Sequence, residues 1–409
     1  MHEDIYSFLD QQQDLALHLQ RELVARPALG PENGGQGEAE KAVFLTSELA
    51  RLGFPQVRNL PAPDTRVESG QRPNLITLLP GQDPTRTLWI IAHTDVVPPG
   101  DPDLWTTDPF TLHQEGDRII GRGVEDNHHG LVASLLGAYA LVQIKKVPAC
   151  NLGLLFVADE ETGNTYGLEY VLQNHSQEFG PDDLFLVPDF GQPDSKMIEV
   201  AEKGLMWLKI TVHGQQCHAS TPQAGQNTLL TAAQCILKLR DLYTLFDQES
   251  DLFNPPFSTF ECTKIEANVP NVNTIPGKDT FYCDCRVLPV YSLDRVIAQV
   301  KDILAEVSRK SGMDIDLEVL HQQAASSSDA HSPLVQGLRE AIARVYKVQA
   351  VPGGIGGGTV AAYARHQGYA AAVWSTLPGN AHQPNEQTSL STILQDAKVM
   401  ADLALDSNI

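Results

Sequence analysis

Histidine and carboxylate side chains follow several short apolar segments of this sequence. Two imidazoles and several carboxylates, with no cysteine among them, form a donor set that suits Zn²⁺, Co²⁺ or Mn²⁺ rather than a metal that seeks thiolates. Segments this apolar are typical of buried strands, and ligands bind at the carboxyl edge of the strands in open α/β sheets. The pattern therefore predicts a hydrolytic metal site. Its candidate residues are His93 and Asp95 after residues 89–92, Glu160 and Glu161 after residues 154–157, Asp189 after residues 185–187, His382 after residues 373–374, and Asp126 in a glycine-rich loop.

Each of these residues, taken singly, has a simpler interpretation. A histidine at a strand end is usually a capping or solvated residue, and a run such as Asp159-Glu160-Glu161 is usually an exposed acidic turn. Here the run directly follows six apolar residues, so a buried strand would deliver its charges into a cleft. Because burying unpaired charges is costly without a cation, the combination favours the metal site.

The elements that position these residues alternate between amphipathic helices and short apolar strands. Short, nearly all-apolar strands separated by helices are typical of a mostly parallel sheet that is covered on both faces. We therefore predict an α/β fold with a mostly parallel sheet flanked by helices. The predicted helices lie in residues 5–28, 38–52 and 129–145, and the predicted strands in residues 75–79, 88–92, 152–157 and 184–187.

A different pattern begins near residue 205, where residues 205–212 alternate as in a strand with one solvated face. The order that follows is β-α-β-β-α-β, which predicts an inserted α+β domain of the ferredoxin-like type. The polar residues 324–329 predict a linker, after which the first pattern resumes. The elements are a helix near residues 225–246, strands near 258–267 and 279–288, a helix near 292–311 and a strand near 314–320, followed after the linker by a helix at 333–345 and a strand at 370–374. We therefore predict a catalytic domain of residues 1–204 and 323–409, and an inserted domain of residues 205–322.

The composition excludes several classes of partner. The 409 residues carry a formal net charge of −22, and no run of basic residues offsets it, so we expect no nucleic-acid partner. The longest apolar stretch, residues 131–144, is interrupted by polar residues and is too short to span a bilayer, so we expect no membrane partner. The acidic N-terminus lacks the features of a signal peptide and the six cysteines are thinly spread, which together predict a cytoplasmic protein with reduced thiols.

Five sequence blocks occur in order along nearly the whole chain. They are residues 92–98, 121–126, 159–163, 218–222 and 380–386, which read AHTDVVP, GRGVED, DEETG, HASTP and NAHQPNE. Their order, and the spacing of His93, Asp126, Glu161 and Asp189, resemble the signature of the M20 peptidases. That family includes acetylornithine deacetylase, succinyl-diaminopimelate desuccinylase, aminoacylases and several dipeptidases. The inserted segment also resembles the lid domain of such enzymes, which usually pairs two subunits, so the resemblance implies a homodimer formed through residues 205–322.

The resemblance implies a role for each metal-site residue. Asp126 would bridge two divalent ions, which would be zinc, with cobalt or manganese as alternatives. Four further ligands would complete the coordination of these two ions. Glu160 would act as the general acid and base. Asp95 would hold the imidazole of His93, although a turn cap at the strand end is the alternative. The four further ligands are His93 and Asp189 for one ion, and Glu161 and His382 for the other.

The resemblance also implies residues that contact the substrate. His218 would reach the reacting oxyanion, in the site of the partner subunit, although a solvated loop histidine is the alternative. Asn273 and Arg286 would receive a substrate carboxylate, and a purely structural Asp284–Arg286 pair is the alternative for Arg286. Gly358 and Thr359 would contact the carboxylate end of the substrate, within a run of glycines that we expect to let the backbone approach the substrate closely.

Two departures from the family pattern bear on the substrate and the ligands. Where the family usually has Met-Lys-Gly after the bridging Asp, this chain has Asn-His-His-Gly, and we assign neither His128 nor His129 to the metal. The position of Asp189 is commonly Glu in the deacylases and carboxypeptidases and Asp in the dipeptidases and aminopeptidases. The blocks at 93–98 and 380–386, however, resemble most the acetylornithine deacetylase and desuccinylase branch. We therefore expect an N-acyl amino acid deacylase, with a dipeptidase or other exopeptidase as the alternative.

Two other functional classes fit the sequence less well. The glycine-rich residues 353–359 lack the Gly-Lys-Ser/Thr ending of a phosphate loop, which disfavours a nucleotide cofactor. A non-catalytic scaffold on the same fold would be free to lose the general base or a ligand. Since every candidate position carries a competent residue, catalysis is the better interpretation.

Overall fold

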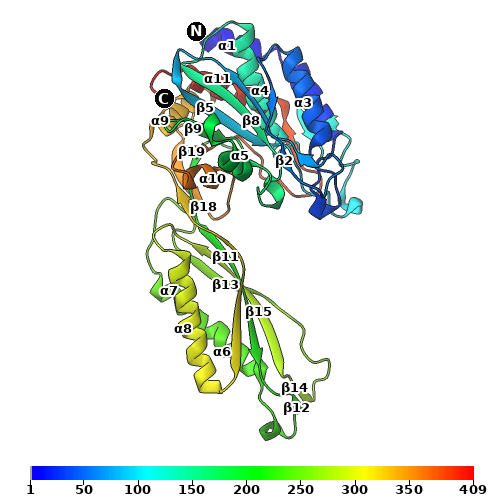
Figure 1. Ribbon diagram of the computed structural model, residues 1–409, viewed down its shortest axis with the longest axis vertical. Helices are drawn as coiled ribbons and strands as arrows, with labels where there is room; N and C mark the ends of the chain where they lie inside the picture. Colours follow the sequence, from blue (N-terminus) through cyan, green and yellow to red (C-terminus); the bar gives the residue numbers. More distant parts are fainter. Residues whose placement is uncertain (1) are drawn as a thin grey trace. The chain divides into compact units, whose positions relative to one another are not determined.

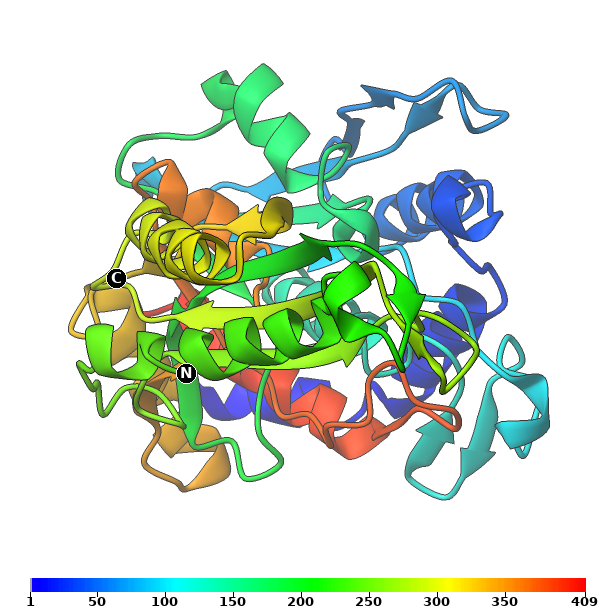
Figure 2. The ribbon, with the colours of Figure 1, turned by 90° about the horizontal axis from the view of Figure 1, so that it is seen from below.

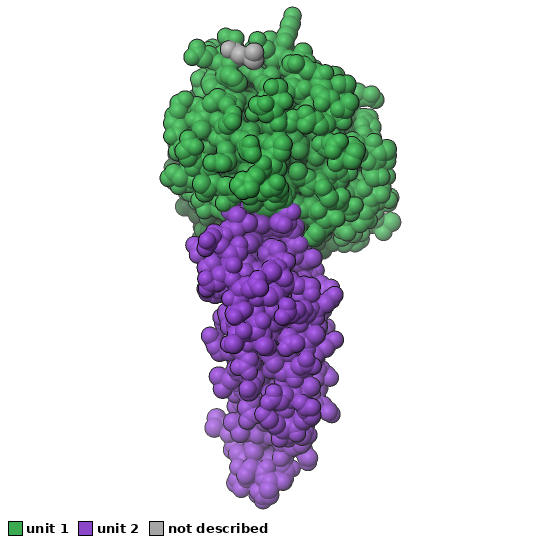
Figure 3. Space-filling model, turned by 90° about the vertical axis from the view of Figure 1, so that its left-hand side faces the viewer, with its two compact units in different colours: residues 1–200, 328–352, 359–409 green, residues 201–327, 353–358 purple. Residues whose placement is uncertain are grey.

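The computed structural model describes residues 2–409 and divides the chain into two compact units, coloured separately in Figure 3. Unit 1 comprises residues up to 200, 328–352 and 359–409, and unit 2 comprises residues 201–327 and 353–358. The glycine-rich segment 353–358 thus belongs to unit 2, which corrects the prediction that all of residues 323–409 belong to the catalytic domain. None of the helices in residues 2–409 combines the length and apolar character needed to cross a membrane.

Unit 1 is built around a mixed sheet whose centre is parallel (Figure 1). Strands β8, β5, β9 and β19 run parallel in that spatial order, and the strands outside them are antiparallel. The prediction of a mostly parallel sheet therefore holds at the centre. In spatial order the strands are β1 (Arg58–Asn59), β4 (Leu75–Leu79), β8 (Cys150–Val157), β5 (Asp83–His93), β9 (Leu184–Val187), β19 (Ala370–Val373) and β10 (Met197–Glu202).

Strand β4 departs from the parallel pattern. It pairs antiparallel with β8, although its sequence is as apolar as that of its neighbours. The chain passes from β4 to β5 through residues 80–82 alone, without a crossover helix. So short a connection cannot carry the chain back along the sheet, so β4 and β5 run in opposite directions with β8 between them. Because β8 is parallel to β5, it is antiparallel to β4.

Helices cover both faces of this sheet. On one face, α5 and α10 contribute side chains to a core with residues of β5, β8 and β9, such as Trp89, Leu155 and Phe185. On the other, α4 packs against β5 and β8 and is buried over most of its surface, because α11, α1 and α2 pack against it as well. The helices of unit 1 are α1 (His2–Leu9), α2 (Gln13–Val24), α3 (Ala39–Arg51), α4 (His128–Gln143), α5 (Leu168–Asn174), α9 (Pro333–Tyr346), α10 (Ala361–His366) and α11 (Leu390–Ala404).

Unit 2 is an antiparallel sheet with helices on one face. Its strands lie in the order β13 (Thr259–Ile265), β15 (Lys278–Val287), β11 (Gly204–His213) and β16 (Asp314–Gln323). Helices α6 (Thr228–Leu239) and α8 (Leu293–Ser311) lie side by side, as Figure 2 shows, and pack on this sheet with the short α7 (Leu242–Leu245). Alternate residues of β11, including Met206, Leu208 and Ile210, form the core beneath the helices. This is the β-α-β-β-α-β order expected for residues 205–322.

Gly354 shows why the glycine-rich segment belongs to unit 2. A Cβ at this position would lie 2.4 Å from the ring of Phe253, and the Lys203 N–H donates to the carbonyl of the neighbouring Ile355 (3.0 Å). The absent side chain thus lets the backbone approach an aromatic ring of the same unit. A Cβ at Gly356 or Gly357 would meet nothing within 4 Å. The structure therefore accounts for Gly354 by internal packing, where the sequence analysis expected an approach to substrate.

Candidate metal centre

The loops after four parallel strands bring the predicted ligands of unit 1 together. His93 ends β5, Glu161 lies in the 3-10 turn after β8, and Asp189 follows β9 by two residues. His382 lies in the long connection after β19, and Asp126 lies in the loop before α4. Because the central strands run parallel, their carboxyl ends meet at one edge of the sheet, as the sequence analysis expected.

The carboxylate of Asp126 lies between two pairs of ligands. Its Oδ1 is 2.8 Å from Nε2 of His93, which is in turn 3.3 Å from Oδ1 of Asp189. Its Oδ2 is 3.1 Å from Nε2 of His382, which is also 3.1 Å from Oε2 of Glu161. The ligand atoms of His93, Asp126 and Glu161 all lie within 4.8 Å of one another. One carboxylate thus faces a different histidine and carboxylate with each oxygen, the arrangement of a bridging ligand.

The charge of this cluster fits divalent cations. Burial alone would lower the pKa of His93, but the neighbouring carboxylates, Asp189 foremost, raise it well above its usual value. Hydrogen bonds with Asp126 and Glu161 raise the pKa of His382 to about 10. Carboxylates outnumber imidazoles here, so the histidines are drawn toward their cationic form. Oε1 of Glu161 is buried and has no hydrogen-bond partner among residues 2–409. An N/O donor set with excess negative charge and an unsatisfied carboxylate oxygen fits two divalent ions.

Glu160 lies beside the ligands and is suited to proton transfer. Its carboxylate forms a second group with His93 and Asp189, in which the ligand atoms lie within 4.8 Å of one another. Burial, and after it the charge of Asp189, raises the pKa of Glu160 well above its ordinary value. A buried carboxyl group whose pKa is raised can both accept and return a proton.

Asp95 supports two parts of the centre at once. Its Oδ1 is 3.4 Å from Nδ1 of His93, and Nδ1 is also 3.1 Å from the backbone carbonyl of Asp95. The backbone N–H groups of Glu160 and Glu161 donate to its two carboxylate oxygens at 3.1 and 3.0 Å. Both alternatives of the sequence analysis are therefore present, because this buried carboxylate faces the imidazole and also caps the turn that carries Glu160 and Glu161.

Two buried glutamates that the sequence analysis left without a role hold the other ligand loops. Glu386 accepts from Arg122 Nη1 (2.7 Å) and from the backbone N–H groups of Gly123, Glu125 and Asp126 (2.8–3.0 Å), which fixes the loop that carries Asp126. Glu125 in turn accepts from the N–H groups of Gly379 (2.7 Å) and Asn380 (2.8 Å), just before His382. Both glutamates lie inside the sequence blocks of the site, next to a candidate ligand or within its loop, and that position is the signal that could have identified them.

Backbone strain is found at two positions of the centre. His382 has a φ of 64° and Asp159, directly before Glu160, has a φ of 60°, a region that residues other than glycine seldom adopt. Asp159 is held there by the N–H of Tyr166 (3.0 Å) and by the buried Arg72 (3.5 Å). Such strain persists where the surroundings over-determine a backbone conformation, and it is common at functional sites.

His128 and His129 lie outside the ligand cluster. Nε2 of His128 is 2.7 Å from the amino group of Lys41, and that group also donates to the Thr94 carbonyl (2.8 Å). Burial, opposed by the carboxylates around it, lowers the pKa of Lys41 to about 7. The two ring nitrogens of His129 contact Thr388 Oγ1 (2.8 Å) and Asp396 Oδ2 (3.0 Å). Leaving both histidines out of the ligand set agrees with these contacts.

Of the predicted substrate contacts, unit 2 holds His218, Asn273, Arg286 and Gly358. The N–H of Ala219 donates to the Asn273 carbonyl (2.9 Å), and β12 (Cys217–His218) pairs with β14 (Thr274–Ile275), so His218 and Asn273 lie on adjoining segments. The N–H of Ser220 donates to Nδ1 of His218 (3.1 Å). In a neutral imidazole this leaves the proton on Nε2, which suits a hydrogen-bond donor.

Arg286 and Thr359 are engaged by their own surroundings. Nε and Nη2 of Arg286 both donate to Asp284, at 2.8 and 2.9 Å, and Nη1 donates to the Gly356 carbonyl (2.6 Å). The bidentate edge of the guanidinium therefore faces Asp284, the structural pairing that the sequence analysis kept as an alternative. Thr359 belongs to unit 1, where its hydroxyl accepts from the N–H of Ala361 (3.2 Å) at the start of α10. Roles for these residues and for His218, Asn273 and Gly358 in substrate binding stay predictions.

Comparisons with known proteins agree with this chemistry. The model of the peptidase family M20/M25/M40 matches residues 89–406. An uncharacterized metallohydrolase of Methanococcus maripaludis is 37% identical over 95% of this chain and 98% of its own length. A succinyl-diaminopimelate desuccinylase of Paracidovorax citrulli is 30% identical over 64% of this chain and 65% of its own. The solved structure of the di-peptidase Dug1p from Saccharomyces cerevisiae shares the fold, with a TM-score of 0.74 and 16% identity over 100% of this chain and 98% of its own.

Proposed function

This chain belongs to the peptidase family M20/M25/M40, a family of metallohydrolases that act on amide or peptide bonds, and we propose that it cleaves the amide bond of an N-acyl amino acid. The observation that carries the proposal is the position of Asp126 between two pairs of ligands, with Glu160 beside one of them. His93 and Asp189 would hold one divalent ion and Glu161 and His382 the other, with Asp126 shared between them.

In the proposed hydrolysis, the metal ions and the residues of the chain would have different roles. Bound divalent ions polarise an amide carbonyl and lower the pKa of a water molecule. Glu160 would take a proton from the attacking water on its carboxylate and return it to the nitrogen of the departing amine, so its proton count is restored at each turnover. Asp95 would act as a positioning residue, because it holds the backbone of Glu160 and Glu161 and faces the imidazole of His93.

Among substrates, a desuccinylase relative and the two sequence blocks at 93–98 and 380–386 support an acyl amino acid. Asp189 supports the second candidate, a dipeptide or other short peptide, since the family commonly has Asp at this position in its dipeptidases. Zinc is the proposed metal, and cobalt or manganese can share the same ligands. A cytoplasmic location is the expectation from the sequence.

Turnover after chelation and reloading tests the proposed function. The protein would be stripped, reloaded with Zn²⁺, Co²⁺ or Mn²⁺, and assayed on N-succinyl-diaminopimelate, N-acetylornithine, N-acetylmethionine and a panel of dipeptides. We expect hydrolysis of an acyl amino acid, and a loss of about 10²–10⁴-fold in kcat for Glu160→Gln, because the amide cannot accept a proton. The metal content of Glu160→Gln is the control and should stay at two ions per chain. Hydrolysis confined to dipeptides would favour the second candidate, and a fully active Glu160→Gln would contradict the assigned role.

We further propose a homodimer formed through unit 2. The helical face of this unit exposes Leu230 (61%), Leu237 (68%) and Leu245 (44%), and the edge strand β13 exposes Ile265 (55%). Apolar side chains this exposed beside a strand edge support an interface with a second copy. Light scattering should give twice the chain mass of 44.7 kDa, and Leu237→Asp should give one chain mass. A monomeric wild-type protein would contradict the proposed dimer, but it would not affect the proposed metal centre.

A further inference from the structure

Two cysteines of unit 2 face each other across neighbouring strands. Cys262 on β13 and Cys283 on β15 are directly paired in the antiparallel register, and their sulfur atoms lie 2.7 Å apart. Directly opposed residues of an antiparallel pair have Cα atoms about 4.5–5.5 Å apart, within the range of about 4.4–6.8 Å that a disulfide spans. The sulfurs are therefore within about 1 Å of bonding distance without any displacement of the strands.

The other four cysteines are arranged differently. Cys150 lies in unit 1, and Cys217 donates to the Thr221 carbonyl (3.6 Å). Cys235 and Cys285 are fully buried in the core of unit 2. No hydrogen bond joins any other two cysteines within residues 2–409. All six are free thiols in the structure.

A metal site is not the better interpretation of this pair. Among residues 2–409, the groups of three or more His, Cys, Asp or Glu ligands within 4.8 Å of one another are found only at the centre in unit 1. Two sulfurs without a third ligand do not make a closed thiolate site, which normally has four ligands. The pair is instead arranged for chemistry between its own two sulfurs.

We propose that Cys262 and Cys283 form a thiol–disulfide exchange site that a low-molecular-weight disulfide oxidises. The thiolate of Cys262 attacks one sulfur of the incoming disulfide RSSR, which gives a mixed disulfide and releases one RS⁻. The sulfur of Cys283 then loses its proton, attacks Cys262 and releases the second RS⁻. Two protein thiols and one RSSR become one protein disulfide and two RSH, so atoms and electrons balance.

The surroundings assign the two roles. Cys262 is half-buried and so can be reached by a small disulfide, whereas Cys283 is only 5% exposed. The hydrogen bond between the two sulfurs lowers the pKa of Cys262, which favours its thiolate as the attacking group. That same hydrogen bond is the largest influence raising the pKa of Cys283, and it ends once the Cys262 sulfur is taken up in the mixed disulfide.

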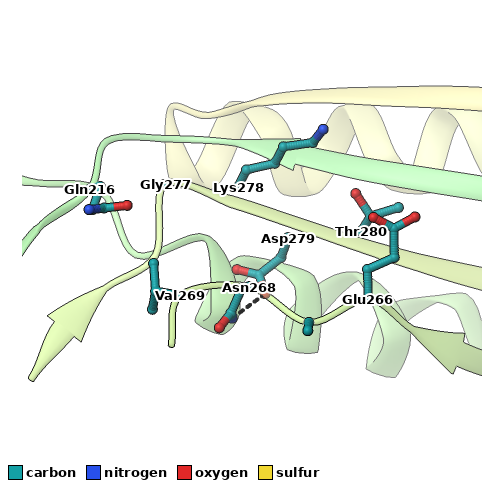
Figure 4. A pocket seen from close by; sticks show the side chains of 9 residues that line it. Gln216, Glu266, Asn268, Val269, Gly277, Lys278, Asp279 and Thr280 are labelled. Carbon is teal, nitrogen blue, oxygen red and sulfur yellow. Dashed lines mark hydrogen bonds between the residues drawn. The ribbon is translucent and has the colours of Figure 1, made fainter. Parts of the chain in front are cut away.

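The disulfide would close residues 262–283, at one end of unit 2, into a covalent ring. Residues 262–283 include the loop 266–273, strand β14 and the predicted substrate contact Asn273. They also supply all but one of the residues that line the pocket of about 370 Å³ in Figure 4, the exception being Gln216. Within this ring, Asn268 Nδ2 donates to Asp279 Oδ1 (2.7 Å), the contact drawn in Figure 4. Closing the ring at its base restricts the opening of this loop.

Mapping of the thiols in the metal-loaded protein tests the proposal. The protein would be equilibrated with reduced and oxidised glutathione at several ratios, quenched in acid, alkylated and digested with trypsin. We expect two of the six thiols to be lost together, and residues 241–264 to be linked to residues 279–286. Fragmentation at Asp284, between Cys283 and Cys285, assigns the linked sulfur. Amide hydrogen exchange of residues 266–273 should slow in the oxidised protein.

Three variants sharpen the test. Cys262→Ser should abolish the link, and Cys283→Ser should trap a glutathione adduct on Cys262 because the second attack is lost. Cys217→Ser removes the other half-buried thiol and should leave the link intact. A stable glutathione adduct on wild-type Cys262, a link from Cys262 to Cys285, or six thiols that survive an excess of oxidised glutathione would each overturn the proposal. If Cys283→Ser folds poorly, the thiol map of the wild-type protein still tests whether Cys262 is linked to Cys283.

Discussion

The substitution Glu386→Gln tests whether one buried carboxylate holds the loop of Asp126, the proposed bridging ligand. Glu386 is fully buried and accepts four hydrogen bonds, two on each oxygen. Glutamine keeps one accepting oxygen and directs an amide N–H toward the other two donors. Two buried donors therefore lose their acceptor, at about 1–3 kcal/mol each. Arg122 is affected most, because its Nε and Nη2 already have no hydrogen-bond partner among residues 2–409.

The magnitude follows from the buried ion pair. Removing one partner of such a pair costs about 3–5 kcal/mol, and this range already includes the lost hydrogen bonds. Burial raises the pKa of Glu386, so a neutral amide relieves part of the desolvation that the carboxylate experiences. We therefore expect Glu386→Gln to lower the free energy of unfolding by about 3 kcal/mol. Metal affinity should fall by about 10–100-fold, the usual effect of losing a group that orients a ligand.

Urea unfolding of the apo-protein and competition with a chelator measure the two effects. Tryptophan fluorescence is suitable, because Trp89, Trp105 and Trp374 lie in unit 1. Glu115→Gln is the matched control, since Glu115 is exposed and pairs with the exposed Arg118, and it should leave both quantities unchanged. A loss of stability below about 1 kcal/mol together with unchanged metal affinity would refute the reasoning, because Asp126 would then hold its position without Glu386.

Two further predictions concern metal uptake. In the apo-protein the pKa of Glu161 is about 7 and that of His382 about 10, and both groups must lose a proton to bind a cation. His93, whose pKa is also raised well above its usual value, must lose a proton as well. Affinity should therefore rise with pH, by at least about tenfold per unit above pH 7 and more steeply below it, in chelator competition between pH 6 and 9, and a flat profile would show that no proton is displaced. Glu125→Gln removes an acceptor from the N–H groups of Gly379 or Asn380, just before His382. The ion that we propose is held by Glu161 and His382 should therefore be lost first, and the metal content should fall from two ions per chain toward one. A metal content that stays at two ions per chain in Glu125→Gln would show that Glu125 is not needed to hold the loop of His382.

The candidate ligands could be predicted from the sequence because each is fixed by local pattern. His93, Glu161 and Asp189 lie at or just after the carboxyl ends of buried strands, and parallel strands end at a common edge whatever their spatial order. The direction of β4 could not be predicted in the same way, because its apolar composition does not distinguish a parallel from an antiparallel neighbour. Within residues 353–358 the structure explains Gly354 by its packing on Phe253, and the predicted substrate contact at Gly358 stays a prediction.

The sequence by itself determined the donor set, the strands that deliver it and the acidic character of the chain. Those properties depend on residue type and on the spacing of residues within short segments of the sequence. Only the tertiary structure decided that each oxygen of Asp126 faces its own histidine, and that Asp95, Glu386 and Glu125 each hold the backbone of a different ligand loop. It alone placed Cys262 against Cys283. The reason is physical, because these contacts join residues far apart in the chain, and which loops meet depends on strand order and register rather than on local sequence.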